Sequence, residues 1–292
     1  MKLKLNRSKL TIQNHQCRDS DEVLEQFHLS RKTRYHYYQS RAIQVGNVVL
    51  NAKTELHPDD LIQITLCSEE DEVIPWFEDI EVLYEDELFL IVNKPAHMLV
   101  HSDGVNQEHT LCNLVKAYYI CQQIHAPVRP LHRLDMETSG IVVFCKLPFF
   151  QPLLDSMLRE KKIQRQYMAL VEGKLPNKKM TITRAIARDR HDARRMRVSN
   201  QGKDARTTIY LEKQYPGYAL IRCQLHTGRT HQIRVHLASI HHPLLSDILY
   251  GEVDARMDRL ALHAFRVKLY HPLLQKELTI DCPIPDDMRR LL

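Results

Sequence analysis

Glycine is scarce in this sequence, and paired cysteine motifs are absent from it. The chain has 8 glycines among 292 residues, whereas an average protein of this length has about 20. This scarcity excludes flexible glycine-rich linkers and argues against phosphate-binding loops that depend on glycine. The 7 cysteines are scattered and contain no Cys-x-x-Cys pair. Neither a disulfide framework nor a thiolate zinc site is therefore expected, and a reducing compartment fits best.

Long uncharged hydrophobic runs are also missing. The first ten residues, MKLKLNRSKL, carry charges and lack the apolar core of a signal peptide. No segment approaches the roughly 18 to 20 uncharged apolar residues that a membrane span needs. The composition, with 43% hydrophobic and 26% charged residues, is that of a globular protein. We therefore expect a cytoplasmic location.

Positive charge is concentrated in one part of the chain. The formal net charge is +5, but residues 159–206 alone hold 15 basic and 5 acidic residues, a net charge of +10. Much of this excess is arginine, whose planar guanidinium suits bidentate phosphate contacts. The segment predicts contact with nucleic acid, with Arg194 and Arg195 as candidate RNA-binding residues. A solvated surface of scattered basic residues is the alternative.

Residues 1–68 are predicted to form a small α/β module. Helices are expected to begin at Asp19 or Ser20 and at Ser30, followed by strands around a turn and a strand at 61–66. This order resembles the small α-L RNA-binding module first known from a ribosomal protein. The second helix carries basic residues that we expect to be exposed and to contact RNA: Arg31, Lys32, Arg34 and Arg41. A purely structural appendage is the alternative.

Residues 69–79, with an acidic run and Pro75, are predicted to be a linker to a second domain at 80–292. Strands are expected within 81–94 and at 141–146, 162–173, 218–226 and 260–270, and helices at 110–125, 149–160 and 229–241. This irregular alternation predicts an α+β domain around a mixed, largely antiparallel sheet, flanked by helices and loops.

The segment LHRLDMETSG (131–140) carries a candidate catalytic carboxylate. It places Asp135 in a loop between apolar segments, with Arg133 before it. Loop carboxylates on a rigid scaffold often perform chemistry, although an aspartate that caps a turn is the alternative. The segment differs from the H-R-D loop of kinases, and no Gly-rich loop or D-F-G accompanies it.

The segment 225–251 is rich in histidine and arginine. Gly228 is expected to permit the turn that opens a helix, with Thr227 or Gly228 at its start and with Arg229 and Arg234 beside it. Its histidines recur every five residues, which advances a helix by about 140°, so they cannot share one face. No metal site is therefore expected from His226, His231, His236 and His241.

The segment RQYMALVEG (165–173) alternates like a strand and includes Tyr167, which taken alone would be a core residue. The motifs H-R-L-D-x-x-T-S-G, T-G-R-x-H-Q-I-R-x-H-L and R-x-Y-x-A-x-V-x-G occur together in this chain. From about Ile80 to Leu292 the chain thereby resembles the RluA-type family of pseudouridine synthases. The resemblance implies an isomerase that detaches the uracil of a uridine in RNA, rotates it and rejoins it through carbon 5, without a cofactor or a metal.

The resemblance also implies roles for individual residues. Asp135 is the essential carboxylate, whether it attacks the ribose, attacks the base or assists a glycal path. Arg234 pairs with it and keeps it ionised and oriented. Tyr167 stacks on the uracil and serves as the general base, and Leu262 packs on the opposite face of the base.

Because a stacked uridine cannot react, it must be flipped out of the RNA. Arg133 is expected to hold the displaced nucleotide or to fill its space, and Arg229 to bind substrate. The target is expected to be a stem-loop of large-subunit rRNA, with tRNA as the alternative, and the protein to be a monomer. A non-catalytic ribosome-assembly factor and a metal-dependent hydrolase are less favoured hypotheses.

The sequence departs from the family at three glycine positions, where it has His97, His241 and Ser246. Gly140 and Gly228 are kept. If the substituted positions need a positive φ, the loops must have rearranged. We expect an active enzyme with altered loop conformations and an altered choice of substrate.

Overall fold

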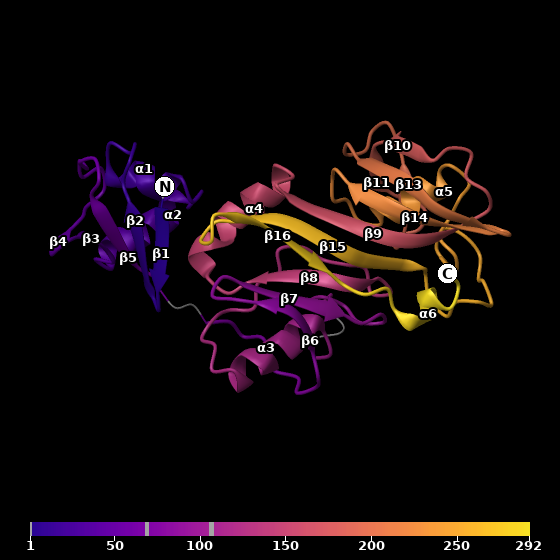
Figure 1. Cartoon of the computed structure of the whole chain (residues 1–292), viewed down its shortest axis with the longest axis horizontal. Coiled ribbons are helices and arrows are strands. Elements are labelled where there is room, and N and C mark those ends of the chain that lie inside the picture. The colour runs from indigo at the N-terminus through magenta and orange to yellow at the C-terminus, as the bar shows by residue number, and fades with distance from the viewer. Residues whose placement is uncertain (1, 68–69, 105–107) are drawn as a thin grey trace.

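The computed structural model describes residues 2–67, 70–104 and 108–292, in which a small N-terminal sheet lies at one end of the long axis, beside a larger sheet (Figure 1). The N-terminal sheet has the strand order β1-β2-β5-β3-β4. Its elements in chain order are β1 (Lys2–Asn6), β2 (Lys9–Gln13), α1 (Ser20–Glu25), α2 (Arg31–Gln39), β3 (Ile43–Val45), β4 (Val48–Val49) and β5 (Leu61–Thr65).

Side-chain caps start both helices of this module where the sequence predicts them. The carboxylate of Asp19 accepts a hydrogen bond from the amide of Glu22 at 3.0 Å, which begins α1. The hydroxyl of Ser30 accepts one from the amide of Thr33 at 3.1 Å, which begins α2. Each cap satisfies an amide that has no partner within the helix. Strands β1 and β2 were not expected.

Aromatic side chains join the module to the rest of the protein. The ring centroid of Phe27 lies 4.7 Å from that of Phe149 and 5.5 Å from that of Phe150, and Tyr37 contacts Phe149 at 5.4 Å. The two phenylalanines belong to a short 3-10 helix, η1 (Pro148–Phe150). These contacts merge the module with the second sheet in one hydrophobic cluster.

The segment that follows the module lies along helix α3 (Leu111–Cys121). The amide of Trp76 donates to the carbonyl of Asn113 at 3.0 Å, and the side-chain amide of Asn113 donates to the carbonyl of Ile74 at 2.7 Å. Lys116 pairs with Asp71 at 2.8 Å. The described part of the predicted linker is therefore fastened along its length, while residues 1, 68 and 69 lie outside the described residues.

The second sheet confirms the expected mixed, largely antiparallel architecture. It has nine strands in the order β10-β13-β14-β9-β15-β8-β7-β6, with β16 paired to β15. Within the described residues, β15 and β8 form its one parallel pair. The strands are β6 (Glu81–Glu85), β7 (Phe89–Lys94), β8 (Ser139–Cys145), β9 (Ile163–Glu172), β10 (Lys179–Thr183), β13 (Arg206–Tyr215), β14 (Tyr218–Leu225), β15 (Leu262–His271) and β16 (Lys276–Asp281).

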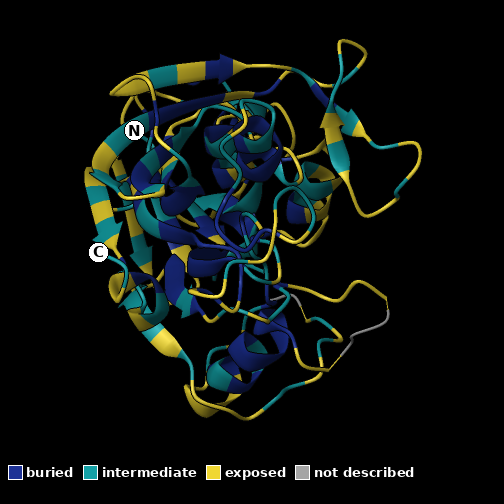
Figure 2. Cartoon of the chain, turned by 90° about the vertical axis from the view of Figure 1, so that its right-hand side faces the viewer, coloured by how far each residue is buried: buried dark blue, intermediate teal, exposed yellow. Residues whose placement is uncertain are grey.

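Strand β9 is buried on both faces near the middle of this sheet. Tyr167, Ala169 and Val171 join one hydrophobic cluster, and Met168 and Leu170 join another. This division follows from the alternation of side chains along a strand. In Figure 2 the central strands are dark blue, and the exposed ribbon lies in outer loops and at the sheet edges. The remaining helices are α4 (Gln151–Arg159), α5 (Gln232–Ala238) and α6 (Asp286–Arg289).

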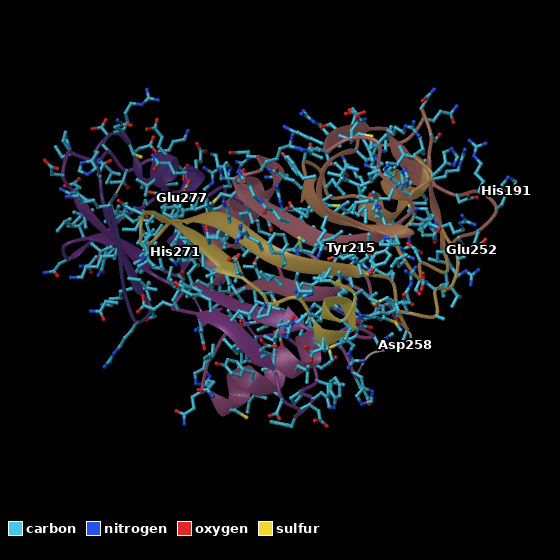
Figure 3. The ribbon with its side chains drawn as sticks, turned by 45° about the vertical axis from the view of Figure 1, so that its right-hand side comes forward. His191, Tyr215, Glu252, Asp258, His271 and Glu277 are labelled. Atoms are coloured by element: carbon cyan, nitrogen blue, oxygen red, sulfur yellow. The ribbon has the colours of Figure 1, made fainter. Side chains whose placement is uncertain are left out.

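A two-stranded hairpin, β11 (Ile186–Arg188) and β12 (Met196–Val198), projects from the basic part of the chain. Figure 3 shows His191, in its connecting loop, at the outer limit of the molecule. We call residues 186–198 the basic hairpin. Its strands, like β10 and β13, were not expected, although Met180 and Ile182 alternate with polar residues in β10. Within the described residues, no helix is long and apolar enough to cross a membrane.

The structure corrects the expected start of α5. This helix begins at Gln232, after His231 with a φ of 53°, and not at Thr227 or Gly228. Gly228 has no positive φ. A Cβ there would lie 2.9 Å from a guanidinium nitrogen of Arg165, the far end of a flexible side chain, so neither a turn nor tight backbone packing requires glycine here.

The three residues that stand at family glycine positions do not avoid a positive φ, so their side chains did not force these positions into another conformation. His97, His241 and Ser246 have φ values of 62°, 63° and 56°. All three therefore retain the left-handed conformation that glycine adopts most readily. Ser246 stabilises its loop, since its hydroxyl donates to the carbonyl of Met257 at 2.7 Å and accepts from the amide of Asp254 at 3.0 Å.

Candidate active site

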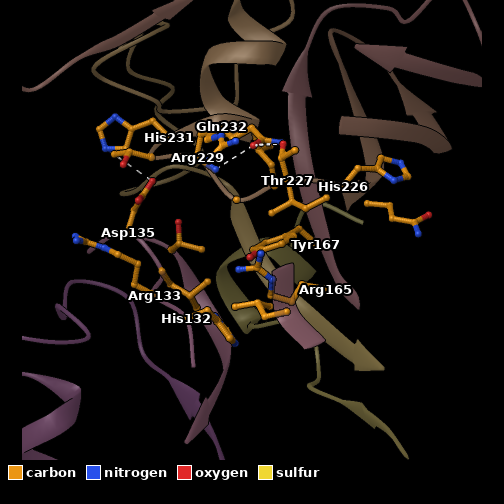
Figure 4. Close-up of a pocket in the computed structure, with 18 of the residues that line it drawn as sticks. His132, Arg133, Asp135, Arg165, Tyr167, His226, Thr227, Arg229, His231 and Gln232 are labelled. Atoms are coloured by element: carbon orange, nitrogen blue, oxygen red, sulfur yellow. Dashed lines mark hydrogen bonds and ion pairs between the residues drawn. The ribbon is translucent and has the colours of Figure 1, made fainter. Parts of the chain in front are cut away.

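A cavity of about 540 Å³ lies between the loop 131–138, the end of α4, strand β9 and the turn from β14 into α5. Its lining includes the three predicted catalytic residues, Asp135, Tyr167 and Arg234. The fold thus brings together residues that are up to 99 positions apart in the sequence. The predicted substrate-binding residues also line it: Arg133, Arg229 and Leu262. Figure 4 shows Asp135 and Tyr167 on different walls.

Two buried cations fasten the loop that carries Asp135. The ammonium of Lys94 donates to the carbonyl of Met136 at 3.0 Å, and also to the carbonyls of Pro95 and Met98 at 2.7 Å each. Burial, together with the charge of Arg259 and against that of Asp135, lowers the pKa of Lys94 to about 7. On the other side, Arg259 donates to the carbonyl of Glu137 at 3.2 Å. The backbone on both sides of Met136 is therefore held in place.

Arg234, which lies on α5, forms hydrogen bonds with two carboxylates. Its Nε and Nη2 donate to Asp247 at 2.8 and 2.7 Å, while its Nη1 donates to Asp135 at 3.4 Å. Burial opposes the charge of Arg234, but the hydrogen bonds to Asp247 and the charges of both aspartates outweigh it and raise its pKa. The guanidinium therefore remains a cation beside Asp135. The predicted pairing is present, but Asp247 as its main anchor was not expected.

His231 is a third group beside the carboxylate, and the sequence patterns assigned it no role beyond excluding it as a metal ligand. Its Nε2 lies 3.9 Å from Oδ2 of Asp135, and its Nδ1 lies 2.9 Å from the hydroxyl of Tyr250. Burial lowers the pKa of His231, although Asp135 opposes this. No clear signal for this was present in the sequence, because His231 precedes α5 in a left-handed conformation and the i,i+3 rule of helices does not apply to it.

Tyr167 and Leu262 form neighbouring parts of the wall. Tyr167 is 4% exposed, and burial raises its pKa, with Arg165 opposing and Asp135 adding to the shift. Leu262 begins β15 and pairs with Ala169 on β9, two residues beyond Tyr167. Its side chain is also buried. The two predicted contacts of the uracil therefore lie on adjacent strands.

The two arginines predicted to bind substrate differ in their contacts. Arg133 is exposed next to the loop of Asp135. Nε of Arg229 donates to the carbonyl of Asp204 at 3.0 Å, and its amide donates to Oε1 of Gln232 at 3.0 Å. Arg133 is thus the more available of the two to RNA.

The four regularly spaced histidines have separate environments. His226 contacts Thr208, His231 contacts Tyr250, and His236 contacts Thr207. His241 is exposed. Among the described residues, no group of three or more His, Cys, Asp or Glu side chains could hold a metal ion.

Most of the basic residues predicted on the second helix are exposed. Arg31, Lys32 and Arg41 lie on the surface of the module. The expectation for Arg34 is wrong, because its side chain is 17% exposed and pairs with Glu25 of α1. A single-sequence pattern could not reveal that an acidic residue of the neighbouring helix faces it.

Arg194 and Arg195 of the basic hairpin have different partners. Arg194 forms an ion pair with Asp192 at 3.0 Å, and its side chain is 78% exposed. The guanidinium carbon of Arg195 lies 5.3 Å from the ring centroid of Tyr250. Arg195 therefore lies against Tyr250, which in turn contacts His231 in the lining of the cavity, whereas Arg194 is paired within its own turn.

A carboxylate and a guanidinium paired beside a buried tyrosine, on a mixed sheet, agree with the site that the resemblance to RNA pseudouridine synthases implies. Residues 88–239 match the family described as RNA pseudouridylate synthase. This chain belongs to that family.

Individual relatives agree with this assignment. The "Uncharacterized RNA pseudouridine synthase YhcT" of Bacillus subtilis is 42% identical over 226 residues, which are 77% of this chain and 75% of that protein. The "Ribosomal large subunit pseudouridine synthase D" of Nitrosomonas europaea is 34% identical over 276 residues, which are 90% of this chain and 79% of that protein.

Solved structures share the fold of the second sheet. The structure of "Human RNA Pseudouridylate Synthase Domain Containing 1" matches with a TM-score of 0.59 and 26% identity over 74% of this chain and 86% of that one. "Human RNA Pseudouridylate Synthase Domain Containing 4" matches with a TM-score of 0.60 and 22% identity over 72% and 92% of the two chains, which supports the fold alone.

Proposed function

We propose that this pseudouridine synthase modifies uridine in large-subunit rRNA and that Asp135 is its essential carboxylate. One observation carries the site assignment: Asp135 faces the cavity and is bonded by the one nitrogen of Arg234 that Asp247 does not occupy. The choice of RNA is supported by relatives named ribosomal large subunit pseudouridine synthase D, which match over 90% and 93% of this chain.

The cavity suits a uridine that has left its stack. Flipping the base costs a few kcal/mol, which contacts with the protein must supply. In our proposal Tyr167 stacks on one face of the uracil, Leu262 packs on the other, and Arg133 holds the displaced nucleotide. The raised pKa keeps Tyr167 protonated in the free site. Stacking fits this state, whereas a role as general base requires the phenol to lose its proton after RNA binds.

We propose that RNA beyond the reacting uridine is held by two surfaces. One is the exposed basic face of the N-terminal module, with Arg31, Lys32 and Arg41, where Tyr35 is 64% exposed and available for stacking. The other is the basic hairpin with Arg194 and Arg195. The enzyme would act as a cytoplasmic monomer.

Tritium release from RNA that contains [5-³H]uridine tests the site, because isomerisation frees the hydrogen on carbon 5. We expect Asp135→Ala to release no tritium above the enzyme-free rate. Asp258→Ala, which removes an exposed carboxylate outside the cavity, is the matched control. This variant should release tritium at the rate of the parent protein. Equal release from Asp135→Ala and the parent protein would refute the assignment of Asp135.

The RNA target is tested separately by mapping pseudouridine in cells with and without the gene. We expect the loss of one or more modified positions in large-subunit rRNA. Loss confined to tRNA would replace the proposed target while leaving the active site intact.

A further inference from the structure

Tyr250 connects parts of the molecule that are distant in the sequence. Its hydroxyl accepts a hydrogen bond from the amide of Met196 on β12 at 2.7 Å and lies 2.9 Å from Nδ1 of His231. The guanidinium carbons of Arg195 and Arg234 lie 5.3 and 5.2 Å from its ring centroid. One half-buried side chain therefore contacts the basic hairpin, the start of α5 and the arginine that bonds Asp135.

The hydrogen-bonding capacity of Tyr250 determines which nitrogen of His231 carries hydrogen. A phenol has one hydrogen to donate, and the amide of Met196 already donates to its oxygen. In the neutral imidazole one nitrogen is a donor and the other an acceptor. Because the carboxylate of Asp135 lies 3.9 Å from Nε2, its charge favours hydrogen on that nitrogen. Nδ1 is then the acceptor, and the hydroxyl of Tyr250 is its donor.

The surroundings of His231 agree with a neutral ring. Burial and the charge of Arg234 both disfavour the imidazolium, whereas Asp135 and Asp247 favour it, and the pKa is lowered overall. Without the hydroxyl of Tyr250, Nδ1 of His231 would lose the hydrogen-bond donor that lies beside it in the structure. The ring could then exchange tautomers or rotate, and its N–H would no longer be directed at the carboxylate.

We propose that Tyr250 is a positioning residue for the isomerisation. Its hydroxyl holds His231 as the Nε2–H tautomer that faces Asp135, and its ring lies against Arg234. The amide of Met196 ties this arrangement to the basic hairpin, so that RNA phosphates bound by the hairpin stabilise the geometry around Asp135. Binding energy gained away from the reacting base is thereby used at the reaction centre. This inference rests on the proposed role of Asp135.

The substitution Tyr250→Phe isolates the hydroxyl, since it keeps the ring that contacts both arginines. We expect kcat for tritium release to fall about ten-fold, with KM within about two-fold of the parent value. Tyr210→Phe is the matched control. Tyr210 also lies against an arginine, with the guanidinium carbon of Arg222 4.1 Å from its ring, and it does not line the cavity. Its kinetics should equal those of the parent protein.

Nitrogen-15 NMR of protein labelled at histidine tests the tautomer directly, with the signals of His231 assigned from a His231→Asn variant. We expect hydrogen on Nε2 in the parent protein and a mixture of tautomers in Tyr250→Phe. Hydrogen on Nδ1 in the parent protein would overturn the proposal, as would a Tyr250→Phe variant with unchanged kcat. Residual activity in Asp135→Ala would instead refute the proposed role of Asp135, because the tautomer is observed independently of turnover.

Discussion

Two loops meet at Arg234, and their aspartates have opposite environments. Asp247 is completely buried and receives two hydrogen bonds from Arg234, and the amides of Leu249 and Tyr250 donate to it at 3.1 and 3.3 Å. The side chain of Asp135 is 23% exposed, faces the cavity and receives a single bond from Arg234 at 3.4 Å.

The difference shows how one arginine can serve both structure and chemistry. The bidentate bond to Asp247 fixes the guanidinium plane, because two parallel hydrogen bonds define an orientation. The remaining nitrogen then meets Asp135 from a fixed direction. A carboxylate that is fully bonded internally cannot approach a substrate, whereas one with free lone pairs can. We therefore interpret Asp247 as the structural partner and Asp135 as the reactive one.

The largest expected effect separates the two aspartates by stability. Asp247→Asn should lower the free energy of unfolding by about 3 to 5 kcal/mol, because it leaves the charge of Arg234 buried without its main partner. Asp135→Asn should lower it by less than about 1 kcal/mol, since that carboxylate is partly exposed and makes one long bond. Urea unfolding of both variants measures this. Equal losses would contradict the division of roles.

An intermediate effect is expected where the basic hairpin contacts the loop of Asp247. Arg195→Glu should weaken RNA binding and reduce the slope of log K against log salt by about 1 for each phosphate that the protein no longer neutralises. Arg194→Glu is the matched neighbour, and we expect a smaller change because Asp192 already pairs with Arg194. Binding titrations at several salt concentrations check this. If neither slope changes, the hairpin is a solvated surface.

The smallest expected effect compares the left-handed residues that support the two loops. His97 lies in the turn next to the loop of Asp135, and replacing it with glycine should raise the free energy of unfolding by about 0.5 kcal/mol through relief of backbone strain. Ser246→Gly relieves similar strain but removes the bonds to Met257 and Asp254, so a loss of about 1 kcal/mol is expected. Thermal unfolding measures both. Equal shifts would show that the hydroxyl of Ser246 contributes nothing.

Local patterns predicted the parts of the fold that depend on local physics. The start of α2 follows from Ser30, and the alternation around Tyr167 predicts a strand that is β9 in the structure. Strand β10 was missed although apolar and polar residues alternate in it, whereas polar and charged residues at both ends of β13 interrupt the apolar pattern there. The predicted exposure of Arg34 was wrong for a different reason, since it depends on the ion pair with Glu25 in another helix.

Only those residues of the candidate site that lie in recognisable sequence motifs could be predicted. Asp135, Tyr167 and Arg234 lie in recognisable segments, and the cavity contains all three. Asp247, His231 and Tyr250 were not assigned roles, because their importance comes from partners rather than from their place in a pattern. The hydroxyl of Tyr250 bonds to an amide 54 residues away, and no sequence periodicity encodes such a contact.

The sequence by itself determined the chemical inventory: the scarcity of glycine, the +10 charge of residues 159–206 and the motifs of the synthase family. Tertiary structure alone decided that Asp247 is buried and that Asp135 faces the cavity. It also decided that His97, His241 and Ser246 keep a glycine-like backbone. The physical reason is that burial and hydrogen-bond satisfaction are set by groups from distant segments, and these meet only when the sheet is complete.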